Sequence, residues 1–195
     1  ESADSLLHRA TALYDQNNYA PAIQLYLKAL EQAESEAQAD RMVLASLYIA
    51  RCHYYLYDRN AALKWYYNAL NTVEKYRVDS LRANVYYNLG VIYLEAEQVD
   101  SAEKYAYAAI QLFRTQKEYA RLAQTYCTLT ELYLNTTKNP QQIESTVAQA
   151  EKYAELSQNK GMMAFAASKR YNYHFFLKKD YREALRYINK AEQLY

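Results

Sequence analysis

Few side chains of this sequence have the spacing that catalysis or metal binding requires. The three histidines, His8, His53 and His174, lie far apart, and no H-E-x-x-H pattern includes them. The two cysteines, Cys52 and Cys127, form no C-x-x-C pair, and both fall within helical patterns. Metal sites are usually marked by closely spaced ligands. We therefore expect two buried free thiols, no metal site and no cofactor.

Glycine is too scarce for most nucleotide-dependent enzymes. The 195 residues include only 2 Gly and 2 Pro. Phosphate-binding loops need several glycines, and the nucleophile elbow needs two around its serine. The sequence has neither pattern, and its acidic residues form no convincing acid/base pair. We expect a non-catalytic, helical protein, because sheets joined by tight hairpins also need turn glycines.

Tyrosine is the distinctive residue, with 24 copies. A tyrosine offers a large contact area and a hydroxyl, and only two side-chain torsions are frozen on binding. Tyrosines in apolar stripes are expected in the core, and others are available for recognition. The expected core set is Tyr19, Tyr26, Tyr66, Tyr86, Tyr93, Tyr126, Tyr133 and Tyr181.

Charge is unevenly distributed, although the net charge is only +1. Residues 1–40 carry two basic and seven acidic residues, whereas residues 160–195 carry eight basic and three acidic ones. This gradient fits head-to-tail contact, an acidic partner at the C-terminal end, or simply solvated helix faces.

Basic residues beside aromatic rings at the C-terminal end can also hold single-stranded nucleic acid. We do not expect that alternative, because the net charge is near zero and most of the rings match core positions. The basic set is Lys169, Arg170, Lys178, Lys179, Arg182, Arg186 and Lys190.

A repeat of 40 residues organises the chain. Ala22, Ala62 and Ala102 are separated by 40 positions, and so are Leu30, Leu70 and Ile110. Further series at the same spacing are Ala29, Ala69 and Ala109, and Ala10, Ala50, Gly90 and Thr130. Small residues at fixed places let helices cross closely, and a helix pair buries its apolar face only against its neighbours. The pattern predicts helices at about 3–15, 19–37, 40–57, 60–76, 79–97, 100–116, 119–136, 140–157, 160–178 and 181–195.

These segments resemble the tetratricopeptide repeat (TPR) family. Residues 86–93 are similar to its first helix, and Tyr19-x-x-Ala22-Ile23-x-x-Tyr26-x-x-Ala29-Leu30 to its second. The spacing of 40 resembles the longer-repeat variety of bacterial regulators and signalling scaffolds. Three features depart from the family pattern. Ala106 stands where the second helix usually has an aromatic residue, and Asn172 stands at the small-residue position of the first helix in the last repeat. Residues 135–140 also lengthen the turn inside the fourth repeat. The resemblance implies an all-α, right-handed α-solenoid of about five helix pairs over residues 1–195. Its repeats are expected at about 3–39, 40–78, 79–118, 119–159 and 160–195.

The resemblance also implies a ligand-binding concave face, lined by the first helix of each pair. A protein or peptide segment is the expected ligand. In the fifth repeat, Lys169 and Tyr173 are aligned with Cys127 and Glu131, at a spacing of 42. The predicted ligand-binding residues are Tyr48, Arg51, Tyr55, Asn84, Tyr87, Asn88, Gln124, Thr128, Glu131, Lys169 and Tyr173.

Some family members clamp a peptide's C-terminal carboxylate with lysines, asparagines and an arginine. Asn88 matches one such asparagine, and the other positions would be Leu47, Arg51, Gln124 and Thr128. Because Arg51 is the only basic residue among them, binding of chaperone tails is not expected.

The two ends of the sequence leave its context open. No apolar run approaches the length of about 20 residues that spans a bilayer. Residues 1–4 lack the features of a signal peptide. The sequence leaves the compartment unknown: cytoplasmic, or periplasmic if a leader was removed. Tyr187, Ile188 and Ala191 keep the last helix apolar. We expect either a longer protein or self-association through that helix, as in an assembly scaffold.

Overall fold

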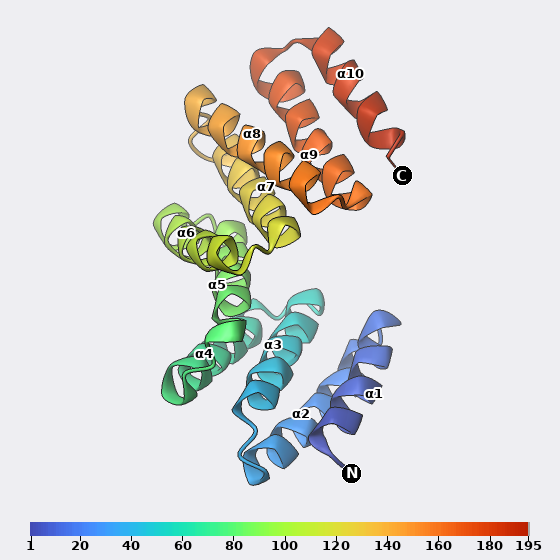
Figure 1. Cartoon of the computed structure of the whole chain (residues 1–195), viewed down its shortest axis with the longest axis vertical. Helices are drawn as coiled ribbons and strands as arrows, with labels where there is room; N and C mark the ends of the chain where they lie inside the picture. The colour runs from blue at the N-terminus through green and yellow to red at the C-terminus, as the bar shows by residue number, and fades with distance from the viewer. Residues whose placement is uncertain (195) are drawn as a thin grey trace. The chain divides into compact units, whose positions relative to one another are not determined.

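The computed structural model describes residues 1–194 and shows an all-α fold of the α-solenoid class (Figure 1). None of these residues lies in a strand. Consecutive helices pack against each other within each compact unit, from α1 to α4 in the first and from α6 to α10 in the second. The α-helices are α1 (Ala3–Asp15), α2 (Tyr19–Ser35), α3 (Ala39–Tyr55), α4 (Arg59–Tyr76), α5 (Asp79–Glu95), α6 (Val99–Gln116), α7 (Tyr119–Asn135), α8 (Pro140–Ser157), α9 (Lys160–Asn172) and α10 (Tyr181–Glu192). A π-helix, η1 (Tyr173–Lys178), follows α9 directly.

The turns between helices are built without glycine. Within residues 1–194, each of the nine connections contains a non-glycine residue with positive φ, for example Ala37 at 55° and Tyr57 at 61°. Side-chain caps then start several helices: the Asp58 carboxylate accepts a hydrogen bond from the Ala61 amide at 3.0 Å. Such a cap satisfies an amide that has no partner within the helix. Short turns of this kind keep successive helices packed side by side.

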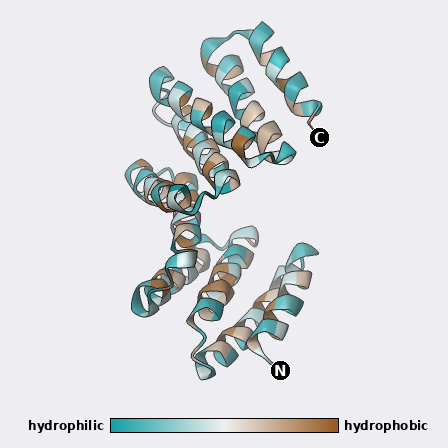
Figure 2. Ribbon diagram, viewed as in Figure 1, coloured by the Kyte–Doolittle hydropathy of each residue, from teal (hydrophilic) through white to brown (hydrophobic). Residues whose placement is uncertain are grey.

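The N-terminal compact unit covers Glu1–Ile92. Its core lies where α1 and α2 meet α3, and Figure 2 shows hydrophobic residues concentrated on α3. The small residues Ala22 and Ala50 are fully buried, as the 40-residue series predicts. Cys52 is also fully buried here, and Tyr26 fills the space between these helices.

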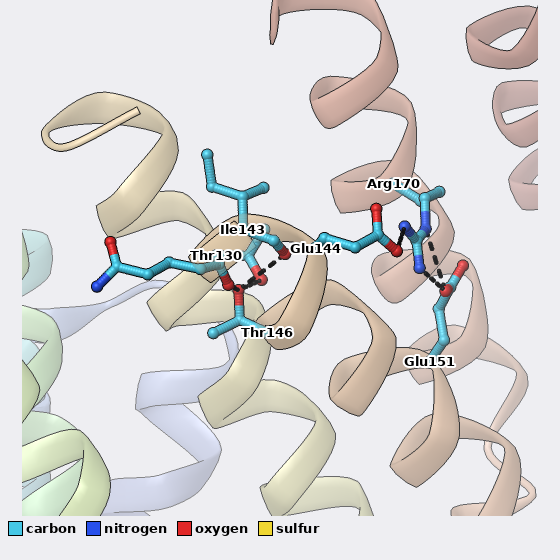
Figure 3. Close-up of polar contacts among 7 residues, drawn as sticks. Thr130, Ile143, Glu144, Thr146, Glu151 and Arg170 are labelled. Carbon is cyan, nitrogen blue, oxygen red and sulfur yellow. Dashed lines mark hydrogen bonds and ion pairs between the residues drawn. The ribbon is translucent and has the colours of Figure 1, made fainter. Parts of the chain in front are cut away.

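The second compact unit begins at Tyr93 and includes α6 to α10. Its largest buried side chains include Phe113, Leu129 and Tyr133. A buried hydrogen bond joins the Thr130 and Thr146 hydroxyls of α7 and α8 at 3.0 Å (Figure 3). Polar groups in a core need such partners, because an unpaired one would cost about 1–3 kcal/mol.

The predicted helices are confirmed with ends that differ by at most two residues, except over residues 160–178 and at the end of the last helix. The predicted end of that helix, at residue 195, lies outside the described residues. Over residues 160–178 the single expected helix becomes α9 followed by η1. Both free thiols are buried, as expected. Of the expected core tyrosines, Tyr19, Tyr86 and Tyr93 are only half-buried, and the prediction for Tyr181 is wrong because its side chain is 61% exposed.

Candidate ligand-binding surfaces

Four tyrosines surround one arginine in the N-terminal unit, and we call Tyr14, Tyr19, Tyr48, Arg51 and Tyr55 the tyrosine–arginine face. Three of them share one side of α3, because positions three and seven apart align on a helix. Ring centroids lie 5.5 Å apart for Tyr14 and Tyr48 and 6.0 Å apart for Tyr14 and Tyr55. Tyr19 and Tyr55 are stacked at 5.2 Å. The rings therefore support each other in fixed orientations.

The guanidinium of Arg51 lies among these rings. Its central carbon is 4.9 Å from the Tyr14 centroid and 5.3 Å from the Tyr48 centroid. These are cation–π distances. Among residues 1–194, the contacts that the structure gives this guanidinium are with aromatic rings rather than with a carboxylate. The cation is oriented, yet it keeps hydrogen-bonding capacity for an anionic group.

The hydroxyls of Tyr14 and Tyr19 are neutral donors at physiological pH. Burial raises the pKa of Tyr14 and of Tyr19 above the ordinary tyrosine value. Tyr48 and Arg51 are half-buried, and Tyr55 is 44% exposed. The face is therefore accessible from solvent and can both donate hydrogen bonds and attract negative charge.

Tyr66 links this face to α5. Burial raises its pKa, and Arg51, Tyr55 and Tyr87 all lie close enough to influence that pKa. The Tyr66 hydroxyl donates to the Asn88 side-chain oxygen at 3.5 Å, and the Asn88 amide donates to the Asn84 carbonyl at 2.7 Å. Of the six predicted ligand-binding residues in the N-terminal unit, Arg51, Tyr55, Tyr87 and Asn88 lie near Tyr66. Tyr48 contacts Arg51, and Asn84 contacts Asn88.

The second unit contains the other predicted ligand-binding residues. Gln124, Thr128 and Glu131 are half-buried on α7. The Thr128 hydroxyl donates to the Gln124 carbonyl at 3.1 Å. A cavity of about 480 Å³ adjoins Glu131. Its other lining residues are Leu134, Asn135, Lys138, Asn172, Phe176 and Leu177.

Lys169 and Tyr173 differ from the prediction of an open face, because they are only 8% and 3% exposed. The burial pattern of α9 follows that of α7 at a spacing of 40, not 42. Lys169 and Tyr173 therefore correspond to the buried Leu129 and Tyr133. The ammonium of Lys169 donates to the Glu131 carboxylate at 2.7 Å, which neutralises a cation expected to face a ligand.

Arg170 takes the place of the small residue Thr130 and is also buried. Its guanidinium donates to the Glu151 carboxylate at 2.6 and 3.1 Å and to the Glu144 carboxylate at 2.5 Å (Figure 3). Burial acts to lower the pKa of Arg170, but the two carboxylates more than offset it and raise that pKa. Two of the seven basic residues named for nucleic-acid binding are therefore engaged inside the protein.

The described part of the chain contains neither a metal-binding cluster nor a membrane-spanning helix. Residues 1–194 contain no group of three or more His, Cys, Asp or Glu side chains placed to hold a metal ion. None of the helices in this range combines the length and the apolar character of a membrane span.

The structure is similar to several solved helical-repeat proteins, although no family model and no curated sequence matches the chain. BtubC (BKLC) from P. vanneervenii matches with a TM-score of 0.78 and 18% identity, over 95% of this chain and 76% of that one. A STAND signal-transduction ATPase with a tetratricopeptide repeat sensor, from Pyrococcus horikoshii, matches with a TM-score of 0.78 and 19% identity, over 96% of this chain and 29% of that one. Aspartyl phosphate phosphatase F from Bacillus subtilis matches with a TM-score of 0.71 and 19% identity, over 98% of this chain and 48% of that one. The chain thus spans less than half of the last two proteins, and it shares the fold of TPR-like helical repeats.

Proposed function

We propose that this chain is a non-catalytic TPR domain of the long-repeat variety that binds a protein or peptide segment. The segment lies against the tyrosine–arginine face of the N-terminal unit and carries a carboxylate. The observation that carries this proposal is the Arg51 guanidinium, which is held between tyrosine rings without a carboxylate contact in the described structure.

The chemistry of this face suits an acidic peptide. A guanidinium can bind a carboxylate through two parallel hydrogen bonds, which fixes the orientation of the ligand. Rings already packed against each other lose little conformational freedom on binding. The tyrosine hydroxyls add donors for peptide carbonyls. Binding would therefore combine one charged anchor with a broad, preorganised aromatic surface.

A role in a bacterial regulator is the finer part of the proposal. The 40-residue spacing supports it, since that spacing resembles the repeats of such regulators. The likeness in fold to a protein with a tetratricopeptide repeat sensor is in keeping with it. In this role the peptide or partner would act as the signal that the domain detects.

Selection of random phage-displayed peptides on the wild-type protein tests the binding function. We expect selected peptides to carry Asp, Glu or a free C-terminus. By calorimetry, Arg51→Gln and Tyr55→Ala should each weaken binding about tenfold, as expected for central interface residues. Tyr76→Ala is the matched control, because this exposed tyrosine on α4 lies outside the face. Equal affinity for all four proteins would contradict the proposal.

A further inference from the structure

The outer side of α10 has the character of an internal helix. Its motif Tyr181-x-x-Ala184-Leu185-x-x-Ile188 repeats Tyr19-x-x-Ala22-Ile23-x-x-Tyr26 of α2. In the N-terminal unit, Ile23 and Tyr26 are buried against α3. In the described part of the second unit no helix plays that role, and Tyr181 and Leu185 are each 61% exposed. This difference marks α10 as a surface for docking.

The exposed side chains form a groove. Its volume is about 280 Å³, and its walls are Tyr171, Phe175, Tyr181, Ala184, Leu185 and Ile188. The Phe175 ring lies 5.4 Å from both the Tyr171 and the Tyr181 ring, in a tilted and an edge-to-face arrangement. These contacts brace the aromatic wall. A preformed apolar groove of this kind suits the apolar stripe of a helix.

The equivalent surface of α2 indicates what fits there. It is covered by Ala45, Ile49 and Cys52, which follow each other at the spacing of one helix face. The occupant of the α10 groove should therefore be a helix with small and medium apolar residues three or four positions apart.

Exposed basic residues are close in sequence to the groove-lining residues of α10. Arg182 and Arg186 lie next to Tyr181 and Leu185 in α10, and Lys178 and Lys179 precede the helix. All four are exposed, and the carboxylate paired with Arg186, that of Glu183, is 3.6 Å away. Complementary charge steers and orients partners at an interface. We propose that this groove binds an amphipathic helix of a partner protein whose apolar stripe is flanked by acidic residues.

A second copy of this chain fits the groove poorly. Two α10 helices face to face would bring their arginines together. The first helix of another copy is no better, because its residues at the three matching positions are Ser5, Arg9 and Ala12. Arg9 stands where α3 has Ile49, so a charged side chain would meet the apolar wall of the groove. With one polar and one charged residue among the three, that side of α1 offers no continuous apolar stripe.

Two synthetic peptides of about 20 residues, long enough to form an isolated helix, test the proposal. Both carry the same Ala/Leu stripe, with Glu flanks in one and Lys flanks in the other. By fluorescence anisotropy with the full chain, we expect the Glu peptide to bind at least about tenfold more tightly. Leu185→Asp should remove binding, and the double variant Arg182→Glu/Arg186→Glu should reverse the preference. Leu156→Asp, at a residue of α8 that is 50% exposed, should bind like the wild type.

Several results would overturn the proposal. These are equal affinity for the two peptides, binding that survives Leu185→Asp, or loss of binding in Leu156→Asp. Circular dichroism establishes whether the Leu185→Asp variant is folded. If that variant is unfolded, the Tyr181→Ala variant takes its place and should weaken peptide binding about tenfold. Sedimentation velocity tests for self-association. If the wild type is a dimer and the Leu185→Asp variant is a monomer, the groove binds a second copy of the chain instead. None of these variants alters the tyrosine–arginine face, so failure here leaves the proposed peptide binding to its own test.

Discussion

Buried cations determine the packing around α9 at the level of single residues. Arg170 occupies a core position, and the Glu151 carboxylate accepts two of its hydrogen bonds. Removing one partner of a buried ion pair leaves a charge poorly compensated in a medium of low polarity. We therefore expect Glu151→Ala to lower the free energy of unfolding by about 3 kcal/mol. Urea denaturation measures the change. Glu155→Ala, at an exposed position one turn later in α8, should change it by less than about 0.5 kcal/mol; equal effects would contradict this account of Arg170.

The buried thiols should make the protein sensitive to alkali. Burial raises the pKa of Cys52 and of Cys127 to about 12, whereas the pKa of a thiol in the unfolded chain is about 8.5. Above that lower value the unfolded chain binds fewer protons than the native one, so stability falls as pH rises. Each thiol should cost up to about 1.4 kcal/mol per pH unit.

Urea unfolding at about pH 8 and about pH 9 tests this loss, because an unfolded thiol ionises over this range while an unfolded tyrosine, with a pKa of about 10, stays mostly protonated. The double variant Cys52→Ala/Cys127→Ala is less stable at both pH values, since each change leaves a small cavity. Its stability should nevertheless fall less between them. A slope identical to that of the wild type would show that the thiols do not cause the pH dependence.

The connections between helices carry a strain that a single substitution can relieve. Ala37 lies between α2 and α3 with φ of 55°, a conformation in which a Cβ atom is crowded and glycine is not. We expect Ala37→Gly to raise the free energy of unfolding by about 0.5–1 kcal/mol. Ala148→Gly, at an exposed position inside α8, should lower it by about 1 kcal/mol. Thermal denaturation followed by circular dichroism compares them, and the same sign for both would be inconsistent with the turn geometry.

Helix positions were predictable because the apolar pattern and the 40-residue spacing both constrain them. The fifth repeat was less predictable. Aligning Asn172 with the small-residue series of Ala10, Ala50, Gly90 and Thr130 displaces Lys169 and Tyr173 by two positions from their structural counterparts Leu129 and Tyr133. The correct alignment places the charged residue Arg170 at a core position, which the sequence alone does not predict. Arg170 can be buried there because Glu144 and Glu151 accept its hydrogen bonds. The spacing of these two glutamates on one side of α8 was the available signal.

At the scale of the whole molecule, the α-solenoid class was predictable, but the composition of the binding surface was only partly so. Tyr48, Arg51 and Tyr55 share one helix face, and their proximity follows from α3 alone. Tyr14 and Tyr19 were missed because they reach Arg51 or Tyr55 from α1 and α2. Such contacts depend on how helices are rotated against each other, and the repeat pattern does not specify that rotation.

The most direct test of peptide binding is a double-mutant cycle between Arg51 and the carboxylate of a selected peptide. Calorimetry gives the affinity of wild type and Arg51→Gln for the peptide and for a version with its Glu changed to Gln. If the guanidinium binds that carboxylate, the four affinities yield a coupling free energy of about 1.5 kcal/mol or more. Additive effects, with a coupling near zero, would show that Arg51 does not recognise the acidic group.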